Sequence, residues 1–307
     1  MMSRRRGRSA TTGSQGVRVG WALVALLGVG AGLWWTAQQP QAGSPSVDAG
    51  RPAVRATPRP PQPRATPRAA LPAARPRPVG RPEPTAAGRV AIIFDDAGAT
   101  REQLDPILLL GRPVTIAVLP GLAASRAVAE RAAAAGLEVL LHVPLEAEET
   151  ERRLGPGGIT TAMTTEEIVA VMRADLADVP GAIGVNGHMG SRATADRRVM
   201  TAVLGVVREY NLFFIDSRTT PATVALPVAQ ELGIPALERT VFLDNEDDPV
   251  YIAGQIRQLL TAARTRAFAI GIGHAQKMTA EVLRDLLPEF DRAGVRLVPV
   301  SVLIGPR

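Results

Sequence analysis

The three histidines of this chain each follow a short run of apolar, largely β-branched residues. His142 ends VLLH, His188 stands in GVNGHMGS, and His274 ends AIGIGH. Because such runs predict buried strands, we expect each imidazole at the end of a strand rather than on the face of a helix. The carboxyl ends of parallel strands open at one side of an α/β fold, so the three side chains should converge despite their separation in sequence.

Aspartates stand behind predicted strands in the same way. Asp95 and Asp96 end IIFDD, Asp216 ends FFID, and Asp244 lies in FLDN. Neighbouring side chains on an extended segment point in different directions, so of Asp95 and Asp96 one can hold a metal ion while the other faces a substrate. An aspartate after a strand can also cap the next helix, which is our expectation for Asp244 and Asp248.

Two neutral imidazoles with one or two carboxylates form a nitrogen and oxygen donor set that suits Zn²⁺ or a similar divalent cation. Such a cation lowers the pKa of water and polarises a carbonyl, while a nearby carboxylate acts as base and a further histidine as acid. The pattern indicates metal-assisted acyl hydrolysis. The chain has no cysteine, which excludes a thiolate nucleophile. A serine hydrolase is disfavoured because no G-x-S-x-G turn surrounds Ser191 or Ser217.

From Arg89 onward, short β-branched runs alternate with stretches of helical period. Strands are expected at 90–94, 114–118, 138–141, 182–185, 212–215, 237–242, 268–272 and 295–298. Helices are expected near 101–110, 122–135, 165–177, 195–209, 223–232, 249–264 and 279–292, with starts at Thr165 and Asp248. This alternation predicts an α/β fold, most simply a (β/α) barrel of seven or eight strands, with a doubly wound open sheet as the alternative.

The amino-terminal part has a different composition. Residues 1–18 are a basic tail, and residues 19–37 form an uncharged apolar segment with Trp21 near one end and Trp34 and Trp35 near the other. The length and the flanking indoles predict a transmembrane helix. A cleaved signal peptide is the alternative, but Ala37 would place Trp35 where a small residue is required. The arginines before the span predict a single-pass protein of the inner (cytoplasmic) membrane with its remainder on the periplasmic, extracytoplasmic side.

Residues 38–88 hold thirteen of the 26 prolines and are expected to be a disordered Pro/Arg/Ala-rich linker. The net charge of +6 is concentrated before the predicted barrel, because residues 1–88 contain thirteen of the 35 basic residues and two of the 29 acidic ones. Residues 89–307 are therefore net acidic. We expect no nucleic-acid partner.

Five motifs, IIFDDAG, GLEVLLHVPLE, GVNGHMGSRAT, FFIDSRT and IGIGHAQ, follow one another between residues 89 and 304. In this order they resemble the divergent polysaccharide deacetylase family. The wider polysaccharide deacetylase superfamily has a distorted (β/α) barrel and removes N-acetyl groups from amino sugars with a bound divalent metal. The resemblance implies that residues 89–307 are a catalytic domain that acts on an amino-sugar-containing envelope polysaccharide. The alternatives are a non-catalytic barrel that binds a glycan or protein and regulates cell-wall remodelling, or another metal hydrolase.

The resemblance also implies roles for single residues. The first aspartate of the pair acts as base and the second as metal ligand, which implies Asp95 and Asp96 respectively. The histidine motif of the family implies His142 as a ligand, and its late histidine implies His274 as the acid. We expect Zn²⁺ as the cation.

One position departs from the family pattern in the expected ligand set. Glu146 stands where a second histidine is usual, four residues after the first. We expect His188 to supply the missing imidazole, with Glu146 in reserve as a ligand. Ser191 and Asp216 are expected to contact the substrate, and Asp216 is also expected to raise the pKa of His274.

Overall fold

The computed structural model describes residues 88–149 and 154–305. The basic tail, the predicted membrane span and residues 38–87 of the linker lie outside these ranges. Among the described residues, no helix combines the length and apolarity needed to cross a bilayer. The predicted span and linker therefore stay predictions from the sequence.

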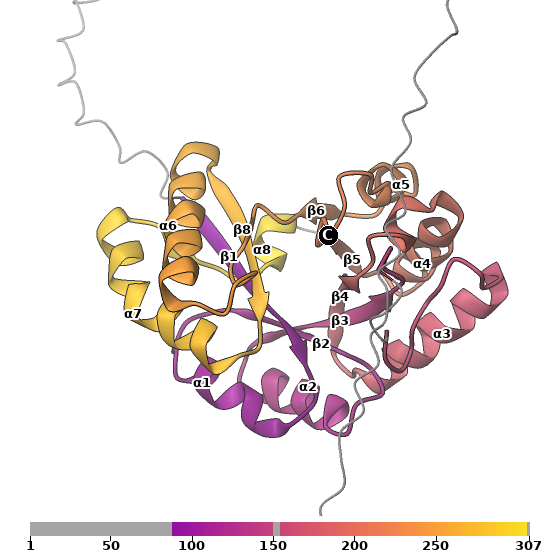
Figure 1. Ribbon diagram of the computed structural model, residues 1–307, viewed down its shortest axis with the longest axis horizontal. Coiled ribbons are helices and arrows are strands. Elements are labelled where there is room, and N and C mark those ends of the chain that lie inside the picture. Colours follow the sequence, from indigo (N-terminus) through magenta and orange to yellow (C-terminus); the bar gives the residue numbers. More distant parts are fainter. Residues whose placement is uncertain (1–87, 150–153, 306–307) are drawn as a thin grey trace, which may run out of the picture. The chain divides into compact units, whose positions relative to one another are not determined.

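The described part of the chain contains one sheet of parallel strands that curls on itself (Figure 1). Its strands are β1 (Arg89–Ala97), β2 (Thr115–Val118), β3 (Glu138–Leu145), β4 (Ala182–Met189), β5 (Phe213–Asp216), β6 (Ala236–Glu238), β7 (Val241–Phe242), β8 (Phe268–His274) and β9 (Arg296–Leu297). They pair in the order β6-β5-β4-β3-β2-β1-β8-β7, and β9 pairs with β1. This order follows the chain without the reversal of a doubly wound sheet, which is consistent with a (β/α) barrel.

The strand predicted at 237–242 is wrong as a single element, because the chain changes partners halfway along it. β6 pairs with β5, whereas β7 pairs with β8 at the other edge of the sheet. Arg239 and Thr240 connect them, and their amides donate to the carbonyls of Asp216 and Ile270 respectively. The two edges of the sheet are thus joined by a two-residue link, which we call the seam.

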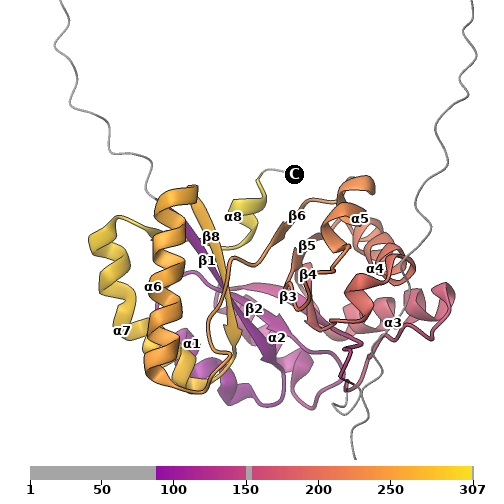
Figure 2. The same ribbon diagram turned by 45° about the horizontal axis from the view of Figure 1, so that its top comes forward.

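Helices cover the outer face of the sheet (Figure 2). They are α1 (Asp105–Leu108), α2 (Ser125–Ala134), α3 (Thr165–Asp178), α4 (Arg197–Glu209), α5 (Ala225–Glu231), α6 (Pro249–Arg266) and α7 (Lys277–Ala293), whereas α8 (Ser301–Ile304) packs against the inner face. The start of α3 is fixed by Thr164 and Glu167, which form a capping box, and that of α6 by Asp248, which accepts from the amide of Tyr251. The predicted helix starts at these two places are confirmed.

Two apolar cores lie on the two faces of the sheet. Val90, Ile92 and Phe94 of β1 belong to the larger core beneath the helices. Ala91 and Ile93, which alternate with them, belong to a smaller core inside the curled sheet. The alternation explains why the strand is apolar throughout: both of its faces are buried.

The amino ends of the strands are covered by α8. Val300 and the partly buried Leu303 pack in the inner core. Glu138, at the start of β3, accepts from both the amide and the hydroxyl of Ser301, and the Thr115 hydroxyl of β2 accepts from the Val300 amide. The polar groups at this end therefore hold the last helix in place.

At the opposite end, four strands run at least two residues further than the sequence predicts. β1, β3, β4 and β8 continue through the acidic and histidine residues that the prediction placed beyond them. The register pairs Asp95 with His274 and His142 with Asn186. Strand pairing therefore brings these polar side chains to the same level of the sheet.

Candidate metal centre

A cleft of about 720 Å³ opens at the carboxyl ends of the strands. Residues of β1, β3, β4 and β8 line one part of it, and the segments that follow β5 and surround β7 line the rest. All three histidines of the chain line this cleft. The predicted convergence of the three imidazoles is confirmed.

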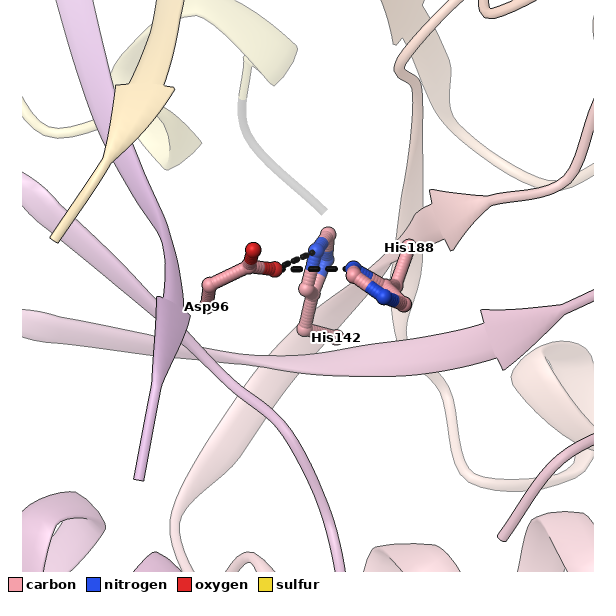
Figure 3. Close-up of side chains that lie close together, drawn as sticks. All are labelled: Asp96, His142 and His188. Atoms are coloured by element: carbon pink, nitrogen blue, oxygen red, sulfur yellow. Dashed lines mark ion pairs between the residues drawn. The ribbon is translucent and has the colours of Figure 1, made fainter. Parts of the chain in front are cut away.

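Three side chains meet closely in this cleft (Figure 3). Oδ1 of Asp96 lies 2.8 Å from Nδ1 of His188 and 3.1 Å from Nε2 of His142. The two imidazole rings pack edge to face, with their centroids 5.1 Å apart. Each of the three residues offers one ligand atom, and these atoms all lie within 4.8 Å of one another. This is the ligand set predicted from the sequence, and we call it the Asp-His-His cluster.

The residues of the Asp-His-His cluster fit a divalent cation. Oδ1 of Asp96 is buried, yet it accepts no hydrogen bond of normal geometry from the described residues, although two imidazole nitrogens lie beside it. The three ligand atoms therefore lie close together without forming hydrogen bonds of normal geometry to one another. This is expected when their lone pairs all point to one position, where a cation can bind. Burial opposes ionisation of Asp96, but the two imidazoles lower its pKa well below the usual range.

Asn186 connects the cluster to Asp95. Its Nδ2 donates to Asp95 Oδ1 at 2.8 Å, and its Oδ1 lies 2.9 Å from Nδ1 of His142. Because an amide oxygen only accepts, His142 carries its proton on Nδ1, which leaves the lone pair of Nε2 directed toward Asp96. Burial raises the pKa of Asp95, although the hydrogen bond from Asn186 opposes this shift. Sequence reasoning missed Asn186, whose signal is an amide within an otherwise apolar strand.

His274 also lies near Asp96. Its Nε2 is 3.8 Å from Asp96 Oδ2, and its Nδ1 is 3.1 Å from Asp244 Oδ1. The hydrogen bond to Asp244 raises the pKa of His274 to about 9, although burial opposes the charged form. The imidazole is therefore a cation at neutral pH. Oδ2 of Asp244 also accepts from the His274 amide at 2.8 Å and from the Thr279 hydroxyl at 2.5 Å.

The comparisons with known proteins agree with this geometry. The sequence profile of the divergent polysaccharide deacetylase family matches residues 92–304. The chain belongs to this family. It is 33% identical over 222 residues to the uncharacterised protein YibQ of Escherichia coli K12, which covers 72% of this chain and 69% of YibQ. An uncharacterised protein of Haemophilus influenzae is 32% identical over 221 residues, or 72% of this chain and 76% of that one.

A solved structure shows the same fold. The crystal structure of the uncharacterised protein ATU2773 from Agrobacterium tumefaciens C58 matches with a TM-score of 0.67. The match covers 73% of this chain and 92% of the other at 23% identity. The curled sheet with its outer helices is thus shared with this protein.

In this member of the divergent polysaccharide deacetylase family, two predictions about aspartates are wrong. Asp244 does not cap a helix, since it binds His274 and Thr279 instead. Asp216 is not the carboxylate that raises the pKa of His274, because Asp244 occupies that position. The physical reason is the pairing of β7 with β8, which places the residue after Phe242 and Leu243 next to the end of β8.

The remaining predicted residues lie outside the lining of the cleft. Asp216 is buried and accepts from the Arg218 amide and the Thr223 hydroxyl. The hydroxyl of Ser191 accepts from the Glu148 amide. Glu146 lies apart from the Asp-His-His cluster, and its carboxylate accepts from the amide and hydroxyl of Thr161. The structure brings together the three predicted ligands, Asp95 and His274, but not these three residues.

Backbone strain accompanies the cleft. Asp96, Met189 and Arg218 line it and have φ angles of 61°, 56° and 49°. Residues other than glycine occupy this left-handed region at a cost and persist there only when the surrounding structure holds them. Asp96 is the last residue but one of β1. Its left-handed backbone turns the carboxylate toward the two histidines.

Proposed function

We propose that this protein is a metal-dependent de-N-acetylase that acts on an amino-sugar-containing polysaccharide of the cell envelope. The observation that carries the proposal is that the Asp-His-His cluster, Asp95 and His274 all line one cleft. Membership of the divergent polysaccharide deacetylase family supports the reaction class. The arrangement provides cation ligands, a buried carboxylate and a cationic imidazole, which are the groups that amide hydrolysis requires.

Asp96, His142 and His188 would hold the cation, for which we propose Zn²⁺. When bound, the cation supplies Lewis acidity to an acetamide carbonyl and to water. Asn186 fixes the protonated nitrogen of His142 and thereby leaves the other nitrogen free to act as a ligand.

Asp95 is placed to act as the base. Its Oδ1 is held by Asn186, and its Oδ2 lies 3.6 Å from Nε2 of His142, beside the ligand atoms. A carboxylate in this position can take a proton from an attacking water without itself moving.

His274 is placed to act as the acid. Asp244 holds its Nδ1, which leaves Nε2 facing the cleft near the second oxygen of Asp96. Asp95 and His274 are separate groups beside the Asp-His-His cluster, so one can accept a proton and the other can donate one to the leaving amine.

We propose further that residues 19–37 tether the protein to the inner membrane and that residues 38–88 separate the barrel from the bilayer, on the periplasmic side. The support is the uncharged apolar segment flanked by tryptophans, with arginines before it. The substrate would then be a glycan that reaches the same compartment.

The test is acetate release together with zinc content, measured on the full-length protein after chelation and reconstitution with Zn²⁺. The parent should bind zinc stoichiometrically and release acetate from an N-acetylglucosamine oligomer. His142→Ala should lose most of the zinc and the activity, because removing a ligand costs several kcal/mol of metal affinity. Glu146→Gln is the matched control and should retain both. A His142→Ala variant that retains stoichiometric zinc would refute the ligand assignment. Zinc binding without acetate release from any N-acetylated glycan would favour a non-catalytic glycan-binding role.

A further inference from the structure

Arg239, an arginine at the seam, has a fixed position but no ion-pair partner among the described residues. The Arg239 side chain lines the cleft, where its Nε donates to the Ser217 carbonyl at 2.7 Å and its Nη2 to the Arg218 carbonyl at 2.9 Å. Its guanidinium carbon lies 5.3 Å from the centroid of the Phe242 ring. These contacts orient the guanidinium on the wall of the cleft that also carries His274, whose ring packs edge to face with Phe242.

Arg239 forms no ion pair among the described residues, although Asp216, Asp95 and Glu238 are near enough to attract its charge from a distance. Among the residues that the structure describes, no carboxylate lies within ion-pair distance of it, and Nη1 has no hydrogen-bond partner. The neighbouring Arg218, by contrast, pairs with Glu238 at 2.6 Å. Burial and the positive charge of Arg218 lower the pKa of Arg239. A partly buried cation without a partner is costly, and an arriving anion would remove that cost.

A second cavity continues from the cleft at this point. It has a volume of about 430 Å³ and shares Arg218 and Arg239 with the cleft. Arg266, at the end of α6, also lines it, and Glu238 is its acidic residue. We call it the seam groove. Three arginines against one glutamate make it basic, whereas residues 89–307 as a whole are net acidic. An extended ligand that leaves the cleft past Arg239 enters the seam groove.

We propose that the seam groove and Arg239 select an acidic glycan, with a carboxylate on the sugar next to the one held at the Asp-His-His cluster. The proposal rests on the proposed function and adds the class of substrate. Arg239 would bind the carboxylate through Nη1, and Arg266 would attract the next acidic substituent along the polymer. One unpaired positive charge at Arg239 matches the single charge of a carboxylate.

Arg239, which is held by hydrogen bonds, and the exposed Arg266 should contribute unequally to binding of an acidic glycan. Loss of a charge-assisted hydrogen bond at Arg239 should weaken binding of an acidic glycan by roughly 10- to 100-fold. Arg266 is exposed, and its loss should weaken binding only about two- to fivefold. Both effects should shrink as the salt concentration rises, most strongly for Arg266.

The probes are two tetrasaccharides with the same N-acetylglucosamine backbone, one neutral and one carrying a lactyl-ether carboxylate on alternate sugars. Binding is measured by titration calorimetry with full-length protein in an Asp95→Asn background, so that the glycan is not consumed. Acetate release is measured separately with the parent protein. The Asp95→Asn protein should bind the acidic probe more tightly than the neutral one. Adding Arg239→Gln should abolish this preference and leave binding of the neutral probe unchanged. Adding Arg257→Gln, the control, should change the affinity for neither probe.

The outcomes separate this inference from the proposed function. Preference for the acidic probe without acetate release from either glycan would support the seam groove and refute the deacetylase. Equal or undetectable binding of both probes would overturn the inference, whatever the acetate assay shows. If Arg239→Gln weakens binding of both probes equally, the arginine only holds the backbone in place, and the inference is overturned. If Arg239→Gln does not fold, Arg266→Gln decides: an unchanged affinity for the acidic probe would refute the seam groove.

Discussion

The two ends of the curled sheet use their polar residues in opposite ways. At the amino ends, Glu138 and Thr115 bind the backbone of α8, and the inner core closes behind them. At the carboxyl ends, Asp95 and His142 are buried, but the left-handed Asp96 is only partly buried and has one buried oxygen without a hydrogen bond among the described residues. One end is built for stability, whereas the other keeps ligand atoms available at a cost in stability.

Asp175 is an exception to this comparison. It is a buried residue of α3, outside the lining of the cleft, and its Oδ2 has no hydrogen-bond partner among the described residues. Burial, with a contribution from Asp178, raises its pKa to about 7. A carboxyl group without a hydrogen-bond partner is thus not confined to the cleft. The difference between the two ends of the sheet is therefore tested by measuring function and stability separately.

The largest effects should come from Asp95 and His274. Asp95→Asn and His274→Ala should each retain zinc and lose activity by roughly 10²- to 10⁴-fold, because each removes one proton transfer. The pH–rate profile of the parent should rise as Asp95 loses its proton and fall as His274 loses its proton. The rising limb should be absent in Asp95→Asn. Near-full turnover by both variants on a glycan that the parent cleaves would make the proposed mechanism untenable.

Asp175→Asn should remove a pH dependence of stability. Because the folded state keeps a proton that the unfolded chain releases near pH 4, the free energy of unfolding should fall as the pH rises from 4 to 7, by up to about 4 kcal/mol. Denaturant titrations at pH 5 and pH 8 measure this difference. It should be much smaller in Asp175→Asn and unchanged in the exposed control Asp285→Asn. Parent stability that is higher at pH 8 would contradict the raised pKa.

Asn186 offers a way to separate the two partners that it holds. Asn186→Ala should weaken zinc binding by about 10- to 100-fold, since it releases His142. Asn186→Asp keeps an acceptor for His142 and should retain more zinc, but it places a carboxylate beside Asp95 and should move the rising limb of the pH–rate profile to higher pH. Equal zinc affinity in the parent and both variants would show that Asn186 does not position the ligand.

The smallest effect should come from the amino end of the barrel. Ser301→Ala removes a hydroxyl that donates to Glu138 and should lower the free energy of unfolding by about 1 kcal/mol. Zinc affinity and acetate release should stay at parent values, because α8 lies at the opposite end of the strands from the cleft. A matched loss of activity in Ser301→Ala would break the comparison between the two ends.

The sequence predicted the elements better than their ends. Apolar runs and helical periods locate the strands and helices, and the parallel fold then brings the histidines together. The prediction ended the first strand before Asp95 and the third before His142, whereas pairing with neighbouring strands carries β1 through Asp95 and β3 through His142. Local patterns contain no information on that pairing.

The partners of the site residues were hardest to predict. Asn186 and Asp95 are 91 residues apart, and Asp244 and His274 are 30 apart, so their contacts depend on the register between strands. The seam shows the same limit, because 237–242 reads as one strand and divides only when β5 and β8 are in place. Residue type and spacing predicted which side chains come together in the cleft, but not which of them form hydrogen bonds with each other.

The left-handed backbone at Asp96 has a consequence for the way the sequence can evolve. Glycine adopts that conformation without strain, so a change of this aspartate to glycine would relieve the backbone while it removed the carboxylate. Folding alone therefore gives natural selection no reason to keep the aspartate. In a lineage that no longer needed the chemistry of the cleft, this position would be among the first free to drift, and the barrel would survive the loss.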